Sequence, residues 1–176
     1  KVGIQAIDKE EMLLEKILNE LPMNYKLRID ANCAWCREIA NQWADILKNF
    51  KNLDWLEQPL EAEDIDGLRE LNTKIPIALD ESLIKFPNLI NTWEGWQIRR
   101  PSQECNPIKL MKELNEMKSL RSISSSFEIG IGRRLLLHFS LLQLQGPTPK
   151  VPGLALRQTP KSFLFSDNPH FIWDQL

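Results

Sequence analysis

The sequence predicts an α/β fold, namely a partial TIM-type (β/α)7β barrel with parallel strands. Short apolar segments alternate with amphipathic helical segments along the chain, which is typical of a parallel sheet with right-handed crossovers. Three successive apolar segments end in a carboxylate, at Asp30, Glu57 and Asp80, and α/β barrels collect functional side chains at that end of their strands. We count about seven strands at most, whereas a complete barrel needs roughly 200 to 250 residues.

The first half of the chain supplies three of these strands and the helices between them. Residues 1–4 resemble the end of a strand, Pro22 terminates the first helix, and Pro59 ends the strand that contains Glu57 because proline cannot donate to a sheet ladder. Apolar residues recur at helical spacing in the first helix, at Met12, Leu13, Ile17 and Leu18. The expected order is a helix over 8–21, a strand over 25–30, a helix over 36–50, a strand over 53–57, a helix over 62–72 and a strand over 75–80.

The second half continues the alternation with one irregular strand. Residues 94–101 stand where a strand is expected, but Gln97, Arg99 and Arg100 interrupt a segment that should be almost continuously apolar. We therefore expect this strand to be short or damaged. The other expected elements are a short helix over 86–93, a helix over 107–118, a strand over 121–128, an apolar helix over 131–144 and a strand near 153–156.

An open doubly wound sheet also fits the alternation, but no glycine-rich dinucleotide loop follows any of the expected strands. Carboxylates on consecutive strands converge best when the sheet curls into a barrel. We expect residues 1–160 to form the incomplete barrel and residues 161–176 to form a C-terminal tail.

Composition restricts the classes of function. With 43% hydrophobic residues, 26% charged residues and a net charge of −2, the chain is typical of a soluble globular domain and gives no reason to expect a nucleic acid or a membrane surface as partner. Cys33 and Cys36 form a C-x-x-C that could serve redox chemistry or half a zinc site, but no second pair follows, so structural thiols are favoured. Free thiols suit a reducing cytoplasm. The oligomeric state stays open.

Asp30, Glu57 and Asp80 offer three oxygen ligands, which suits Mg²⁺ because this ion prefers oxygen donors and retains room for water and substrate. The alternative is that each acid caps the following helix or pairs with a nearby cation. Three acids at consecutive strand ends favour the metal site.

Two further features lie at expected strand ends. Lys1 would lie close to the cation, where a lysine pKa can fall far enough for the amine to act as a base; alternatively, it is an unordered terminal lysine. Ser124, Ser125 and Ser126, followed by a helix that begins near Gly130, could bind a carboxylate, although a serine run is also typical of a polar turn.

Five segments carry a family resemblance, and they occur in one order: Lys1-Val2-Gly3, Leu27-Arg28-Ile29-Asp30-Ala31-Asn32, Trp55-Leu56-Glu57-Gln58-Pro59, Ala78-Leu79-Asp80-Glu81-Ser82 and Ile123-Ser124-Ser125-Ser126-Phe127-Glu128. Together they resemble the barrel domain of the enolase superfamily, and within it the o-succinylbenzoate synthases of menaquinone and phylloquinone biosynthesis. The resemblance extends from Lys1 to about Pro160. It implies a (β/α)7β barrel, one Mg²⁺ and an N-terminal capping domain; the cap, the first strand and nearly all of the second are missing here.

The resemblance also implies a role for each site residue. Asp30, Glu57 and Asp80 would be the Mg²⁺ ligands. Lys1 would remove the proton α to the substrate carboxylate and then help the hydroxyl leave. The substrate contacts would be Asn32 beside the metal and Ser124, Ser125 and Ser126 at the succinyl carboxylate. The implied reaction is the Mg²⁺-dependent dehydration of a cyclohexadiene carboxylate (SHCHC) to o-succinylbenzoate.

One position departs from the family pattern. The family has a lysine before a proline at the sixth strand, and this chain has Arg100 before Pro101. Arginine stays protonated, so it cannot act as a base, although it could offer a cation to the face of the substrate ring. One-base dehydration therefore remains possible, and the two-base N-acylamino-acid racemase or dipeptide epimerase reaction is disfavoured. A catalytically inactive remnant is the alternative from another class.

Overall fold

A computed structural model describes the chain except for residues 6, 23, 118–119, 155–161, 167 and 176. The chain divides into two compact units, Lys1–Gln97 and Ile98–Leu176, and each is described by itself. The boundary expected between residues 160 and 161 lies outside the described residues.

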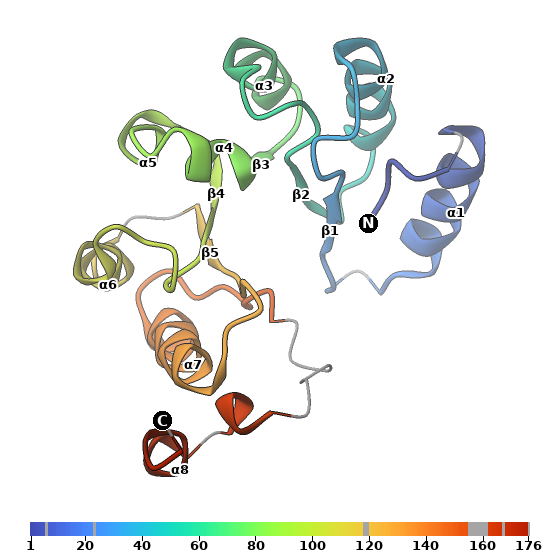
Figure 1. Cartoon of the computed structure of the whole chain (residues 1–176). Helices are drawn as coiled ribbons and strands as arrows, with labels where there is room; N and C mark the ends of the chain where they lie inside the picture. Colours follow the sequence, from blue (N-terminus) through green and yellow to red (C-terminus); the bar gives the residue numbers. More distant parts are fainter. Residues whose placement is uncertain (6, 23, 118–119, 155–161, 167, 176) are drawn as a thin grey trace. The chain divides into compact units, whose positions relative to one another are not determined.

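The first unit is built from parallel βα repeats (Figure 1). Its strands pair in sequence order, with Asp30 opposite Glu57, Glu57 opposite Ala78, and Ala78 opposite Trp96. The predicted parallel sheet is therefore confirmed. The elements are α1 (Ile7–Glu20), β1 (Leu27–Asp30), α2 (Arg37–Leu47), β2 (Leu53–Glu57), α3 (Ile65–Asn72), β3 (Ile77–Leu79), α4 (Glu81–Lys85), α5 (Leu89–Thr92) and the first half of β4 (Trp96–Arg99).

The core of the first unit joins these strands to the helices that cover them. The indole rings of Trp35 and Trp43 stack with their centroids 5.4 Å apart, and α2 and α3 contribute a row of buried side chains beneath them. Burying side chains of this kind stabilises the fold by roughly 1.5–3 kcal/mol each. The largest apolar side chains of this unit that are fully buried are Trp43, Leu47, Trp55, Leu56, Leu60, Leu68, Leu71, Ile77 and Leu79.

The second unit continues the same design from the end of β4. The backbone N–H of Ser124 donates to the carbonyl of Arg99 at 2.9 Å, which places β5 beside β4. The elements are α6 (Pro107–Asn115), β5 (Arg121–Ile123), α7 (Gly130–Gln145), a 3₁₀ turn η1 (Phe163–Phe165) and α8 (Pro169–Trp173). Its core is formed by Leu110, Leu114, Ile123, Leu136 and Phe139.

The strand expected near 153–156 is reduced to one contact in the described residues. Gly153 forms an isolated parallel bridge with Ser124, and its N–H donates to the carbonyl of Ile123 at 2.8 Å. Residues 155 and 156 lie outside the description.

β4 is a regular strand of only four residues, so of the two alternatives expected here the short strand is confirmed and the damaged strand is not. The Arg99 side chain is only 1% exposed. Its guanidinium donates to both carboxylate oxygens of Glu104, at 2.6 and 2.7 Å, and to Glu113 at 2.8 Å. A buried charge is tolerated when it is paired in this way, and a sequence pattern does not show the partner.

Two further expectations differ from the structure. Residues 1–4 do not form a strand; instead the N–H of Val2 makes one hydrogen bond, 3.0 Å long, to the carbonyl of Asp30. The short helix α4 directly after Asp80 was not expected. Within the described part of the chain, every helix is too short or too polar to cross a bilayer.

Candidate active site

Three carboxylates lie at the same end of three neighbouring strands. Asp30 and Glu57 are the last residues of β1 and β2 and face each other in register. Asp80 follows β3 directly and is 1% exposed. Because parallel strands end on one side of their sheet, the sequence order is sufficient to bring these acids together.

The acids influence one another electrostatically. Burial raises the pKa of Glu57 to about 7, and the negative charges of Asp30 and Asp80 raise that pKa in the same direction. A hydrogen bond from the indole of Trp55 and the charge of Lys1 oppose the shift. A positive ion beside Glu57 would relieve this repulsion and favour the ionised carboxylate.

Lys1 and Asn32 lie beside the first of these acids. The Lys1 ammonium donates to the Asp30 carboxylate and to the side-chain oxygen of Asn32. The Asn32 backbone N–H donates to Asp30 at 2.9 Å, and its side-chain amide donates to Glu81 at 3.1 Å. The expected base therefore lies beside one of the expected metal ligands.

The donor set suits a hard divalent cation, although the side chains are not arranged around one. Among the described residues, no three His, Cys, Asp or Glu side chains are positioned to share an ion, and the cation beside Asp30 is the Lys1 ammonium. Three carboxylates at adjacent strand ends nevertheless provide the oxygen donors that Mg²⁺ prefers. The three carboxylates therefore fit Mg²⁺ by the chemistry of their donor atoms and not by the present arrangement of their side chains.

Sequence reasoning did not recognise the role of Gln58. Its side chain is completely buried, and its carbonyl oxygen accepts from the backbone N–H groups of Asp80 and Ser82, at 3.0 and 3.2 Å. Its amide nitrogen donates to the Ser82 hydroxyl at 2.8 Å. Gln58 thereby fixes the turn that carries Asp80. The available sequence signal was a polar residue between Glu57 and Pro59, directly after the end of β2.

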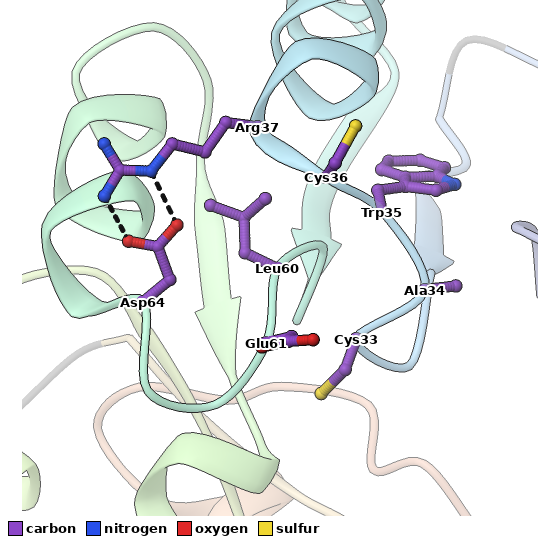
Figure 2. A pocket seen from close by; sticks show the side chains of 8 residues that line it. All are labelled: Cys33, Ala34, Trp35, Cys36, Arg37, Leu60, Glu61 and Asp64. Atoms are coloured by element: carbon purple, nitrogen blue, oxygen red, sulfur yellow. Dashed lines mark hydrogen bonds and ion pairs between the residues drawn. The ribbon is translucent and has the colours of Figure 1, made fainter.

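A pocket of about 350 Å³ lies between the loops that follow β1 and β2 (Figure 2). Arg37 and Asp64 form an ion pair on one wall, and Glu61 and Cys33 also line the pocket. The sulfur atoms of Cys33 and Cys36 point in different directions, and both thiols are free.

The Cys33 thiol is protonated at neutral pH. Burial raises its pKa to about 12, and the negative charges of Glu81, Asp80 and Asp30 act in the same direction. Nucleophilic attack and metal binding both require the thiolate. The structural interpretation of Cys33 is therefore favoured over a redox or zinc role.

The second unit contains the other residues expected at the site. The Arg100 guanidinium donates to the backbone carbonyl of Ser125. The hydroxyls of Ser124 and Ser125 both donate to the carbonyl of Gly153, at 3.1 and 3.5 Å. Arg100 thus lies against the backbone of the serine run, and two of the three hydroxyls already have partners.

Ser126 differs from its neighbours. Its backbone N–H donates to both carboxylate oxygens of Glu128 at 2.9 Å, and Glu128 also accepts from the Ser102 hydroxyl at 2.7 Å. The Ser126 hydroxyl is buried, and the described residues give it no hydrogen-bond partner. The proposed substrate cradle therefore has one hydroxyl to offer.

Comparison with known proteins gives consistent results. The Enolase C-terminal domain-like family matches residues 1–92, the segment that contains Lys1, Asp30, Glu57 and Asp80. The o-succinylbenzoate synthase of Thermosynechococcus vestitus is 35% identical over 148 residues, or 78% of this chain and 46% of that protein. The enzyme of the same name from Haemophilus influenzae is 30% identical over 165 residues, or 88% of this chain and 48% of that protein.

A solved structure shows a similar fold. The o-succinylbenzoate synthase from Thermosynechococcus elongatus BP-1, complexed with Mg in its active site, superposes with a TM-score of 0.75 at 25% identity. The alignment covers 99% of this chain and 57% of that one, so the predicted partial barrel is confirmed. The chain spans about half the length of the curated relatives it matches.

Proposed function

This chain belongs to the Enolase C-terminal domain-like family, and on that premise we propose that it carries the catalytic barrel residues of an Mg²⁺-dependent lyase. The reaction is the dehydration of a cyclohexadiene carboxylate (SHCHC) to o-succinylbenzoate, in menaquinone or phylloquinone biosynthesis. The observation that carries the proposal is the contact of Lys1 with Asp30 at the end of β1, in a sheet where Glu57 ends the neighbouring strand β2 and Asp80 directly follows β3. The similarity to two synthases supports the choice of substrate.

The proposed Mg²⁺ ligands are Asp30, Glu57 and Asp80. When bound, Mg²⁺ supplies positive charge that offsets the charge developing on the substrate carboxylate. Gln58 contributes indirectly, because its side chain fixes the backbone N–H groups of Asp80 and Ser82.

Lys1 performs the proton transfers. Its neutral amine takes the proton α to the carboxylate, and the resulting ammonium returns a proton to the departing hydroxyl. One C–H bond and one C–O bond break, one C=C bond forms, and water leaves. Asn32 orients the amine through its side-chain oxygen. General acid–base catalysis of this kind is worth about 10²- to 10⁴-fold in rate.

The serine run and Arg100 complete the proposed substrate contacts. The Ser126 hydroxyl, which is buried without a partner among the described residues, is the strongest candidate to receive the succinyl carboxylate. Ser124 and Ser125 shape the backbone around it through their bonds to Gly153. Arg100 provides a fixed cation, and the free thiols fit a cytoplasmic reaction.

Racemisation of N-acylamino acids is the second candidate within the superfamily. It needs a deprotonated group on the opposite face of the substrate, and the arginine at position 100 stays protonated. The synthase reaction needs only Lys1 as its base. We therefore rank dehydration first.

The test is to join this chain to the part of the Thermosynechococcus vestitus synthase that it does not cover, which gives a restored protein. We expect the restored protein to convert SHCHC to o-succinylbenzoate, as followed by chromatography. Lys1→Arg should lower kcat by about 10²-fold or more, and Asp80→Asn should abolish turnover. Asp66→Asn, on the exposed surface of α3, is the matched control. Absence of product from the restored protein would favour the inactive remnant.

A further inference from the structure

Glu10 is a buried acid on α1 that the proposed reaction does not use. It is 8% exposed, and its carboxylate accepts three backbone hydrogen bonds, from Gly3 at 2.9 Å and from Ile4 and Gln5 at 3.0 Å each. Successive backbone N–H groups that converge in this way form an anion-binding concavity, known as a nest. The nest of this chain is filled by its own carboxylate.

The charge state of Glu10 agrees with this geometry. Burial opposes ionisation, but the hydrogen bonds from Gln5, Gly3 and Ile4 act against burial, and the Glu10 pKa is lowered from its ordinary value. Glu10 is therefore an anion at neutral pH, and its three hydrogen bonds are charge-assisted, which makes them stronger than neutral ones.

The segment that Glu10 binds leads directly to Lys1. Val2 donates its N–H to the carbonyl of Asp30 at 3.0 Å, and the Lys1 ammonium contacts the side chains of Asp30 and Asn32. Two anchors therefore fix the backbone around Lys1, one on β1 and one on Glu10.

Apart from these hydrogen bonds, Val2 packs against the core of the first unit. Ile4 is 84% exposed, and residues 1–5 are neither helix nor strand. Gly3 has φ +87° and lies so close to the loop after β1 that an added Cβ would be 2.7 Å from the Cβ of Ala34. Its left-handed backbone turns the amides of the nest toward α1, a conformation that glycine adopts at low cost.

We propose that Glu10 is a positioning residue for Lys1: by filling the nest formed by Gly3, Ile4 and Gln5, it fixes the backbone that carries the Lys1 amine to Asp30 and Asn32. The inference rests on the proposed function only for the catalytic role of Lys1. The placement of Lys1 by Glu10 can be tested separately.

The first test is amide hydrogen exchange measured by NMR on the chain itself, in Glu10→Ala and Glu10→Gln variants. The control is Glu15→Ala, an exposed acid on the same helix. The amide of Val2 is the reporter, because it bonds to Asp30 and not to Glu10. The interior reference is the amide of Leu56, which donates to the carbonyl of Pro76.

In Glu10→Ala we expect the amides of Val2, Gly3, Ile4 and Gln5 to exchange about tenfold faster or more, a local opening that leaves Leu56 unchanged. Glu10→Gln, which keeps the shape and one acceptor oxygen, should give the same pattern with a smaller increase, and Glu15→Ala should change nothing. An unchanged Val2 rate would overturn the inference. So would an equal increase at Leu56, because Glu10 would then act only on global stability.

The second test uses the restored protein. Glu10→Ala should lower kcat about tenfold or more with KM unchanged, because the base is misplaced while the substrate contacts remain, and Glu10→Gln should recover part of the loss. An unchanged kcat would overturn the positioning role. If the restored protein makes no product at all, the proposed function fails, and the Val2 exchange rate still decides whether Glu10 places Lys1.

Discussion

The indole N–H of Trp55 donates to the carboxylate of Glu57 at 3.3 Å. The indole is 1% exposed and lies between the Arg28 guanidinium, 4.1 Å from its ring centroid, and the ring of Trp96, 4.7 Å away between centroids. The fluorescence of Trp55 should therefore report on the acidic site, because a cation that binds Glu57 changes the electrostatic environment of the indole.

We predict that Mg²⁺ changes the tryptophan fluorescence of the chain and that Trp55→Phe removes most of the change. The measurement is an emission titration with MgCl₂ against a matched ionic strength of NaCl. Trp173→Phe, which removes an exposed tryptophan from α8, is the control and should keep the response. An undiminished response in Trp55→Phe would show that Mg²⁺ acts elsewhere.

Mg²⁺ should also raise the thermal midpoint of the chain. An ion that binds only the folded state adds about 2.7 kcal/mol of stability at 100 times its Kd, and it relieves the repulsion among Asp30, Glu57 and Asp80. Asp80→Asn should abolish the Mg²⁺-dependent increase, and Asp66→Asn on α3 should preserve it. Scanning calorimetry with and without millimolar Mg²⁺ makes the comparison. A midpoint that ignores Mg²⁺ in the unmodified chain would contradict the metal site.

The buried ion pairs of the second unit predict a large effect on stability. Arg99→Met removes the arginine partner of Glu104 and one of the two arginine partners of Glu113, which keeps Arg121; breaking a buried pair and leaving the Glu104 charge uncompensated typically costs about 3–5 kcal/mol. The control is Arg69→Met, whose exposed pair with Asp66 should be worth about 0–1 kcal/mol. Urea unfolding at pH 7 measures both. Equal losses in the two variants would mean that the Arg99 network adds nothing beyond a surface pair.

The same network sets a dependence of stability on pH. Burial opposes the ionisation of Glu113, but Arg121 and Arg99 outweigh it and lower the pKa of Glu113 from its ordinary value of 4.5. The unfolded chain therefore binds more protons near that value, so the stabilisation is present above about pH 4.5 and is lost as pH falls through the lowered folded pKa. Urea unfolding between pH 3 and 6 should show this loss, with a weaker pH dependence in Glu113→Gln. An equally steep profile in that variant would assign the loss to other acids.

Local signals were sufficient to predict much of the sheet. Residues 53–57 were expected as a strand and form β2 (Leu53–Glu57), because a short apolar run ends at a carboxylate and Pro59 follows closely. The short helix α4 was missed because Gln58 stabilises it from another strand by accepting the backbone N–H of Ser82. A contact of that kind leaves no pattern in the helix itself.

The first helix shows why part of the site could not be predicted. The apolar stripe was assigned to Met12, Leu13, Ile17 and Leu18. Leu18 is buried, but Met12 is 73% and Leu13 57% exposed, whereas Glu10 is buried. The Glu10 carboxylate can be buried because its hydrogen-bond partners are backbone amides. Backbone amides do not depend on the residue type, so no residue in the sequence indicates these bonds. The acidic strand ends, by contrast, could be located because strand order alone brings them together.

Arg100 separates the two enzyme reactions considered for this chain. Its guanidinium donates to the carbonyl of Ser125, so it orders the serine run and stays protonated. In the restored protein we expect dehydration of SHCHC without exchange of the α-proton of N-acylamino acids from the second face. Arg100→Lys supplies an amine that can lose its proton, which should raise dehydration turnover and open exchange from both faces, since a positioned base contributes about 10²- to 10⁴-fold.

Deuterium incorporation into each enantiomer of an N-acylamino acid, followed by proton NMR, measures this change, with Arg134→Lys on α7 as the exposed control. Exchange from both faces in the unmodified restored protein would show that the α-proton can be removed from the second face despite Arg100. Racemisation of N-acylamino acids would then be as good a candidate function as dehydration. If Arg100→Lys gains no exchange while dehydration proceeds, position 100 does not face the substrate, and Arg100 then acts by ordering the serine run through its bond to Ser125.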